Sequence, residues 1–258
     1  MKIGICAPPQ YWAAAKETGY DHVEWNFSIT AGYTEEQMKE YLALKDSLDL
    51  LIPSFNGFFP GGHPMFDQDQ AGIEAWTREY AKNGFAKAAR FGADVAVMGS
   101  GYARNIPEGM DPKIAKERFA RLMYILGEEG KAAGMRVAIE PLQQKETNFL
   151  HTLQEGAEIC EMVGHSHVGL TLDIFHIWAG GEPLSNIEKY KQYIFHAHIA
   201  RPQLDRKAPT IDDLADCLIW RDAMRAIGYD DKISLEPVYS PDFIGDITGA
   251  YPVLKEFR

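Results

Sequence analysis

Four residues of types that commonly bind metal ions end four apolar segments in the second half of the chain. They are Glu140 in VAIE, Asp173 in LTLD, His198 in HAHI and Glu236 in ISLE. The intervals between them are 33, 25 and 38 residues, each about one strand and helix long. Because side chains alternate between the two faces of a strand, all four groups lie on the face opposite the apolar residues. This pattern predicts that the four side chains converge at one edge of a sheet.

Three carboxylates and one imidazole form a hard, oxygen-rich ligand set. Such a set suits Mn²⁺ or Mg²⁺ and also accepts Co²⁺, whereas Zn²⁺ is better matched by thiolates or several histidines. Any one of these residues alone is explained as well by a solvated rim carboxylate or a helix cap. Because three crowded carboxylates repel one another without a cation, we expect the set to bind one divalent ion, with Mn²⁺ favoured.

The elements that would position these groups alternate along the whole chain. Strands are predicted at 3–7, 22–26, 50–55, 94–98, 136–140, 168–173, 194–199 and 233–236, and helices at 9–18, 34–48, 67–90 and 112–133, with further helices in the remaining gaps. Alternating strands and helices indicate a parallel sheet. Eight such units in 258 residues match a (β/α)8 TIM barrel, in which chemistry lies at the C-terminal ends of the strands. We predict one α/β domain over residues 1–258; the alternative is an open doubly wound sheet.

The same alternation assigns residues that are not ligands to the inside or the outside of the barrel. Glu24 and His196 are predicted to point inward, and His196 is predicted to be a buried histidine with a hydrogen-bond partner. Phe195 is predicted to point outward. The loop carrying Phe55, Phe58, Phe59 and His63 is predicted to form either a lid or apolar wall at the site, or a packed surface loop or subunit contact.

Composition excludes several classes of partner. The net charge of −11 opposes nucleic acid, and no apolar run approaches the ~18 residues of a membrane span. Three widely spaced cysteines form no disulfide framework, and the N-terminus shows no signal-peptide pattern, so we expect a cytoplasmic protein. The Gly99-Ser100-Gly101 turn lacks the rest of a phosphate-binding motif and is explained as a tight strand–helix turn.

The motifs together resemble a known family. Glu140-Pro141, ETNFL at 146–150, LDIFH, HAHIA and SLEP are similar to the xylose isomerase-like barrel superfamily, in its sugar isomerase and ketose 3-epimerase branch of the D-tagatose 3-epimerase type. The resemblance covers essentially the whole chain. It implies that a metal polarises an open-chain keto sugar and that Glu140 and Glu236 move a proton through a cis-enediolate. It also implies a homodimer or homotetramer.

Three more residues are assigned through this resemblance. His176 matches a histidine that binds substrate oxygens, and Glu146 matches a glutamate that orients the same region. A substrate-binding arginine normally follows the metal histidine by six residues, where this chain has Leu204. Arg206 is a better candidate than Arg201 for this substrate-binding arginine, because a loop of altered length could carry Arg206 inward.

Other activities of similar barrels stay open at this stage. A metal-dependent lyase, such as an inosose-type dehydratase or a C-glycoside deglycosidase, could use the same enediolate. A non-catalytic metal-bearing barrel subunit is a further alternative. An endonuclease with three zinc ions is disfavoured, because the predicted strand at 94–98 ends in Met98-Gly99 instead of a histidine and the chain is acidic.

Overall fold

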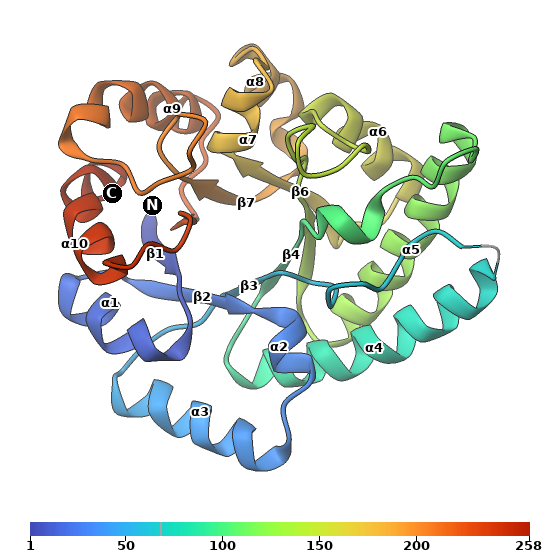
Figure 1. The fold of residues 1–258 in the computed structure, drawn as a ribbon, viewed down its shortest axis with the longest axis horizontal. Helices are drawn as coiled ribbons and strands as arrows, with labels where there is room; N and C mark the ends of the chain where they lie inside the picture. The colour runs from blue at the N-terminus through green and yellow to red at the C-terminus, as the bar shows by residue number, and fades with distance from the viewer. Residues whose placement is uncertain (68) are drawn as a thin grey trace.

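Eight parallel strands close into a barrel in which each strand pairs with the next along the chain and β8 pairs with β1 (Figure 1). The computed structural model describes residues 1–67 and 69–258. This architecture confirms the predicted TIM barrel. The strands are β1 (Lys2–Cys6), β2 (His22–Asn26), β3 (Ser54–Asn56), β4 (Val95–Met98), β5 (Arg136–Ile139), β6 (Val168–Asp173), β7 (Ile194–Ile199) and β8 (Lys232–Leu235).

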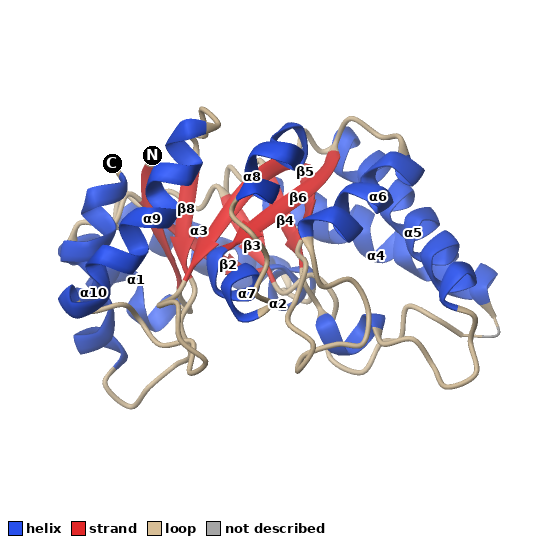
Figure 2. Cartoon of the chain, turned by 90° about the horizontal axis from the view of Figure 1, so that it is seen from above, coloured by secondary structure: helices blue, strands red, loops and turns tan. Residues whose placement is uncertain are grey.

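Helices surround the strands on the outside, as the second view shows (Figure 2). The α-helices are α1 (Trp12–Thr18), α2 (Phe27–Ala31), α3 (Glu35–Ser47), α4 (Gln70–Arg90), α5 (Pro112–Ala132), α6 (Leu153–Val163), α7 (Ile174–Ala179), α8 (Ser185–Tyr190), α9 (Leu214–Ala226) and α10 (Phe243–Leu254). Short 3-10 helices are η1 (Pro9–Tyr11), η2 (Gly101–Arg104), η3 (Lys191–Tyr193), η4 (Ile211–Asp213) and η5 (Lys255–Phe257). Among the described residues, no helix is both long and apolar enough to cross a membrane.

Two predicted boundaries move for local reasons. The third strand was expected at 50–55 but begins at Ser54, directly after Pro53, which has no N–H to give to a strand ladder. The helix expected from residue 67 begins at Gln70, where the Asp69 side chain accepts a hydrogen bond from the Gly72 N–H at 3.0 Å. Part of the predicted start falls on residue 68, which lies outside the described residues.

The prediction that Phe195 points outward is wrong. Between β6 and β7 the register shifts: Leu170 pairs with Ile194, but Thr171 pairs with His196, so Phe195 is an extra residue. Its ring lies with the interior side chains of Val95, Val97 and Ala138. Gly169 leaves the room for that ring, because a Cβ there would lie 2.5 Å from it.

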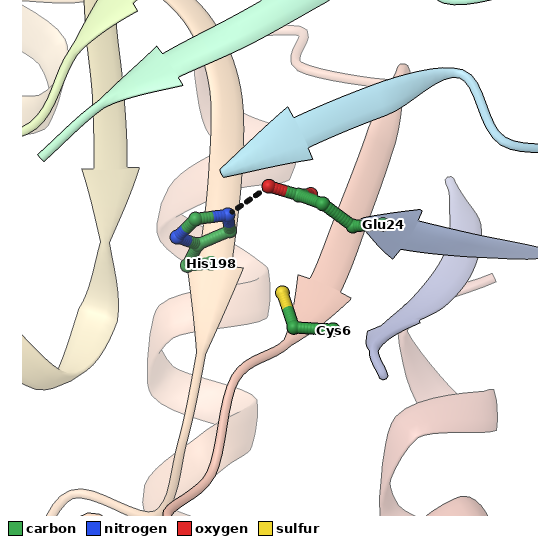
Figure 3. A group of neighbouring side chains, drawn as sticks. All are labelled: Cys6, Glu24 and His198. Atoms are coloured by element: carbon green, nitrogen blue, oxygen red, sulfur yellow. Dashed lines mark hydrogen bonds and ion pairs between the residues drawn. The ribbon is translucent and has the colours of Figure 1, made fainter. Parts of the chain in front are cut away.

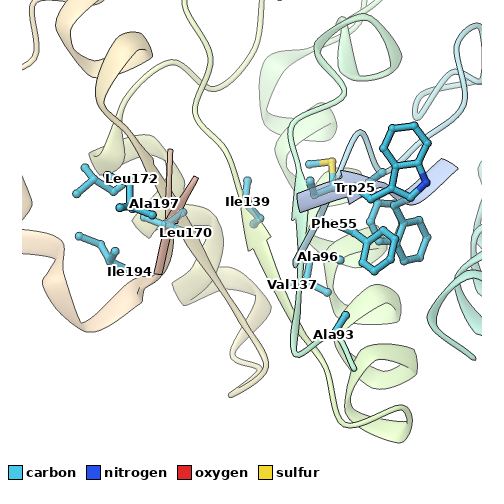
Figure 4. Packing of buried hydrophobic residues seen from close by; sticks show 14 of the residues in the cluster. Trp25, Phe55, Ala93, Ala96, Val137, Ile139, Leu170, Leu172, Ile194 and Ala197 are labelled. Carbon is cyan, nitrogen blue, oxygen red and sulfur yellow. The ribbon is translucent and has the colours of Figure 1, made fainter. Parts of the chain in front are cut away.

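The outward faces of the strands form the apolar layer beneath the helices. Val137, Ile139, Leu170 and Leu172 are buried in it, and so are the aromatic rings of Trp25 and Phe55 (Figure 4). The inward faces of β2, β3, β7 and β8 instead carry buried polar groups. This division leaves an apolar layer under the helices and a row of buried polar groups on the inner faces of these four strands, and the barrel opens at the C-terminal ends of the strands.

Candidate metal centre

The C-terminal ends of β5, β6, β7 and β8 bring together Glu140, Asp173, His198 and Glu236. One potential ligand atom from each lies within 4.8 Å of those of the others. His198 Nδ1 is 2.9 Å from Glu140 Oε1, 3.2 Å from Glu236 Oε2 and 3.9 Å from Asp173 Oδ2. The side chains of Glu140, Asp173 and His198 are almost fully buried. That of Glu236 is 21% exposed. The cluster therefore faces the mouth of the barrel through Glu236.

The surrounding backbone positions two of the carboxylates, those of Asp173 and Glu140. Asp173 caps α7, because its Oδ1 accepts a hydrogen bond from the His176 N–H at 3.2 Å, and its Oδ2 is left to face the cluster. Glu140 lies against Gly99, where an added Cβ would stand 2.3 Å from Glu140 Oε2. The glycine after β4 therefore provides room for a carboxylate.

The arginine predicted to enter the site does lie there. Arg206 Nη2 is 3.1 Å from Asp173 Oδ2 and 2.5 Å from Glu236 Oε2, and the guanidinium stands over the Phe175 ring. The loop turns at Arg206 itself, which has a φ of +49°. Arg201 instead forms an ion pair with Asp205, outside the cluster.

Glu146 and His176 lie beside this arginine. Glu146 Oε1 is 3.5 Å from Arg206 Nη1 and 3.9 Å from His176 Nδ1. The Gln143 N–H donates to His176 Nδ1 at 3.3 Å, which places the imidazole proton on Nε2. That buried Nε2 has no hydrogen-bond partner among the described residues and lies 3.7 Å from Asp173 Oδ2.

The field inside the cluster strongly favours a cation. Burial tends to lower the pKa of His198, but the charges of Glu24 and Glu236 and hydrogen bonds to Glu140 and Glu236 outweigh it, so the pKa lies well above the usual value. Burial raises the pKa of Glu140. For Asp173, burial is outweighed by the neighbouring His176, Arg206 and His198, and its pKa falls to about 2. Three carboxylates and an imidazole nitrogen in this field fit a hard divalent ion.

A second group of side chains shares His198 with the cluster. Glu24 on β2 and Cys6 on β1 point toward the imidazole from the barrel interior (Figure 3). Sequence reasoning placed Glu24 inside the barrel but not against His198, and it did not single out Cys6. Burial, reinforced by Glu24, raises the pKa of Cys6 well above the usual value, so Cys6 stays a neutral thiol. His196 is a buried histidine with a hydrogen-bond partner, as predicted, and that partner is Glu24.

A cavity of about 690 Å³ adjoins the cluster and is lined from the ends of β1, β2, β3 and β8. Its polar lining includes Asn26, Asn56, Arg206 and Glu236. Asn56 Nδ2 donates to Glu236 Oε1 at 2.7 Å and so orients that carboxylate toward the cavity. Phe58 and Phe59 of the aromatic loop do not line this cavity, and Phe58 is fully buried and stacks on Phe27.

Comparison with known proteins places this geometry in context. The family described as xylose isomerase-like TIM barrel matches residues 12–251. An inosose isomerase of Halalkalibacterium halodurans is 26% identical over 198 residues, which are 70% of this chain and 63% of that protein. The chain thus matches less than two thirds of that relative's length.

Solved structures share the fold at low identity. The 3-keto-D-glucoside 4-epimerase of E. coli superposes with a TM-score of 0.81 at 16% identity, covering 100% of this chain and 99% of that one. A D-allulose 3-epimerase from Methylomonas sp. in complex with D-allulose gives 0.82 at 16% identity, over 100% and 97% of the two chains. A D-psicose 3-epimerase gives 0.82 at 17% identity, over 99% and 98%.

Proposed function

Because the chain belongs to the xylose isomerase-like TIM-barrel family, we propose that it is a divalent-metal-dependent isomerase or epimerase of keto sugars. The observation that carries the proposal is the position of Glu140, Asp173, His198 and Glu236 beside the 690 Å³ cavity. The similarity to an inosose isomerase supports the same class of reaction. A divalent cation held by these four residues would polarise a substrate carbonyl and acidify the adjacent C–H bond.

Glu140 and Glu236 are the proposed acid–base pair. They come from β5 and β8, which are separated by two strands, and both lie within 3.2 Å of His198 Nδ1. One carboxylate takes the proton next to the carbonyl, and the C–H electron pair forms the double bond of an enediolate. A proton returned by the other glutamate to the same carbon, on the opposite face, inverts that carbon. Return to the former carbonyl carbon, while the hydroxyl proton of the first carbon passes to the former carbonyl oxygen, moves the carbonyl to the first carbon; where that carbon is C1, ketose and aldose interconvert.

The remaining polar groups are proposed to bind substrate oxygens. The buried His176 Nε2–H has no partner in the described protein and can donate to a hydroxyl or carbonyl oxygen. Arg206 lines the cavity and offers further N–H donors, and Glu146 orients Arg206 from the rim. Arg206 is the one basic side chain among the described residues of the cavity wall, and two carboxylates already neutralise it. This balance supports an uncharged sugar over a sugar phosphate.

Deuterium exchange tests the proposal. The protein is stripped with a chelator, supplied singly with Mn²⁺, Mg²⁺, Co²⁺ or Zn²⁺, and incubated in D2O with a panel of ketoses and inososes. We expect metal-dependent deuterium uptake beside the carbonyl, seen by NMR, and its loss in Glu140→Gln and Glu236→Gln. Uptake with the carbon skeleton and all hydroxyls retained supports the isomerase or epimerase. Loss of water or an aglycone would assign the site to a lyase, and absence of exchange on every substrate with metal bound would contradict an enediolate enzyme.

A further inference from the structure

We propose that Glu24 is a positioning residue that fixes the His198 imidazole with Nδ1 directed at the cation, and that the Cys6–Glu24–His198 group is not a second metal site. The inference rests on the proposed metal site. Glu24 Oε1 lies 2.9 Å from His198 Nε2, and both side chains are fully buried (Figure 3). The two nitrogens of this ring therefore face two differently built groups, the three carboxylates at Nδ1 and Glu24 at Nε2.

Most of the acceptor capacity of Glu24 is already used. Its second oxygen, Oε2, lies 2.7 Å from His196 Nε2 and receives hydrogen bonds from Ser54 Oγ at 2.8 Å and Ser234 Oγ at 2.7 Å. With His198, four donors converge on a carboxylate that has about four acceptor sites. Oε2 therefore accepts three of these hydrogen bonds, and Oε1, which accepts one from His198, is the only oxygen of Glu24 with a free lone-pair position.

The four donors also anchor Glu24 in place. They come from β3, β7 and β8, while Glu24 itself stands on β2, so the carboxylate is tied to strands on both sides of it in the closed sheet. All of these groups are fully buried. A carboxylate held in this way cannot rotate to follow His198, so His198 must adopt the orientation that Glu24 dictates.

That orientation decides which nitrogen can bind a metal. An imidazole that donates from Nε2 to Glu24 keeps its proton there, so Nδ1, which faces Glu140 and Glu236, is the nitrogen left to bind a cation in place of its hydrogen bonds to these carboxylates. Binding a second cation through Nε2 would require breaking this 2.9 Å bond and removing the proton. Carboxylates placed in this manner behind metal-binding histidines orient the ring and raise the basicity of the ligating nitrogen.

Metal affinity in two matched variants tests the role of Glu24. Glu24→Gln keeps the shape but offers one acceptor oxygen instead of two, and we expect its Kd for Mn²⁺, measured by titration calorimetry, to rise about 10- to 100-fold. Ser54→Ala removes one donor to Oε2 and leaves the Oε1 contact with His198, so its Kd should stay within about 2-fold of wild type. A purely structural role would lower the melting temperature of both variants and change neither Kd.

A second measurement needs no variant. In ¹⁵N-labelled wild-type protein loaded with diamagnetic Zn²⁺, the imidazole spectrum of His198 should show the proton on Nε2 and none on Nδ1. A proton on Nδ1, or equal Mn²⁺ affinity of wild type and Glu24→Gln, overturns the positioning role while the metal site stands. If the wild-type protein binds no divalent ion, the proposed metal site fails, and the inference fails with it.

Discussion

A methyl group placed at Gly99 should disable the site while leaving the fold intact. Gly99 follows β4, and a Cβ built there would lie 2.3 Å from Glu140 Oε2, where ordinary contact begins near 3.4 Å. In Gly99→Ala the carboxylate must therefore retreat by about 1 Å, a displacement that typically costs about 100-fold in rate. The clash falls on the end of a side chain and not on the backbone, so the strain moves Glu140 instead of the barrel.

The expected loss corresponds to about 2.7 kcal/mol of transition-state stabilisation. The assay is the initial rate of deuterium uptake from D2O into the substrate that the panel identifies, at saturating Mn²⁺. Urea denaturation accompanies it, and the free energy of unfolding should change by no more than about 1 kcal/mol. Gly249→Ala, in α10, is the matched control, because an added Cβ there meets no atom within 4 Å. A Gly99→Ala enzyme with wild-type exchange would refute the assignment of Glu140 to the reaction.

Three further perturbations follow from the same geometry. Asn56→Ala removes the 2.7 Å hydrogen bond to Glu236 Oε1, and the exchange rate should drop about 10-fold or more; an unchanged rate would mean that Glu236 needs no orientation. Burial lowers the pKa of His22 from 6.5 to about 3, so between pH 6.5 and pH 5 only the unfolded state binds a proton at this residue. This proton uptake should lower the free energy of unfolding by about 2 kcal/mol from pH 7 to pH 5. His22→Gln, compared by urea denaturation, should lose that part of the slope, and an identical slope would contradict it. Mn²⁺ at 100 times its Kd should stabilise the folded protein by about 2.7 kcal/mol, seen as a higher melting temperature than in chelator, and His198→Asn should weaken this rise; an equal rise in that variant would place the ion elsewhere.

The sequence predicted the architecture and the composition of the cluster because both depend on local periodicity. Apolar alternation located β2, β6 and β7 at their observed bounds, and ligand-type residues at matching strand ends implied a common edge. Phe195 shows where this reasoning fails. One extra residue in β7 reverses the side of the sheet to which the Phe195 side chain points, and the alternation of apolar and polar residues does not reveal this extra residue.

Contacts across the barrel could not be predicted from the sequence, for a different reason. Alternation places Glu24 inside, but its contact with His198 depends on the stagger between strands 174 residues apart in sequence. The hydrogen bond from Asn56 to Glu236 and the space beside Gly99 likewise depend on the relative positions of the strand ends. Arg206 could be suggested only because a familiar spacing was broken at Leu204, and its place in the site depends on a loop conformation with positive φ.

Anomalous scattering from Mn²⁺ in crystals of the protein tests the central claim most directly. Data collected above and below the manganese absorption edge would locate the ion without reference to activity. The account predicts one peak within coordination distance of carboxylate oxygens of Glu140, Asp173 and Glu236 and of His198 Nδ1. A peak bounded by Cys6 and His198 Nε2, or no peak at the ends of β5 to β8 in protein that binds Mn²⁺ in solution, would contradict it.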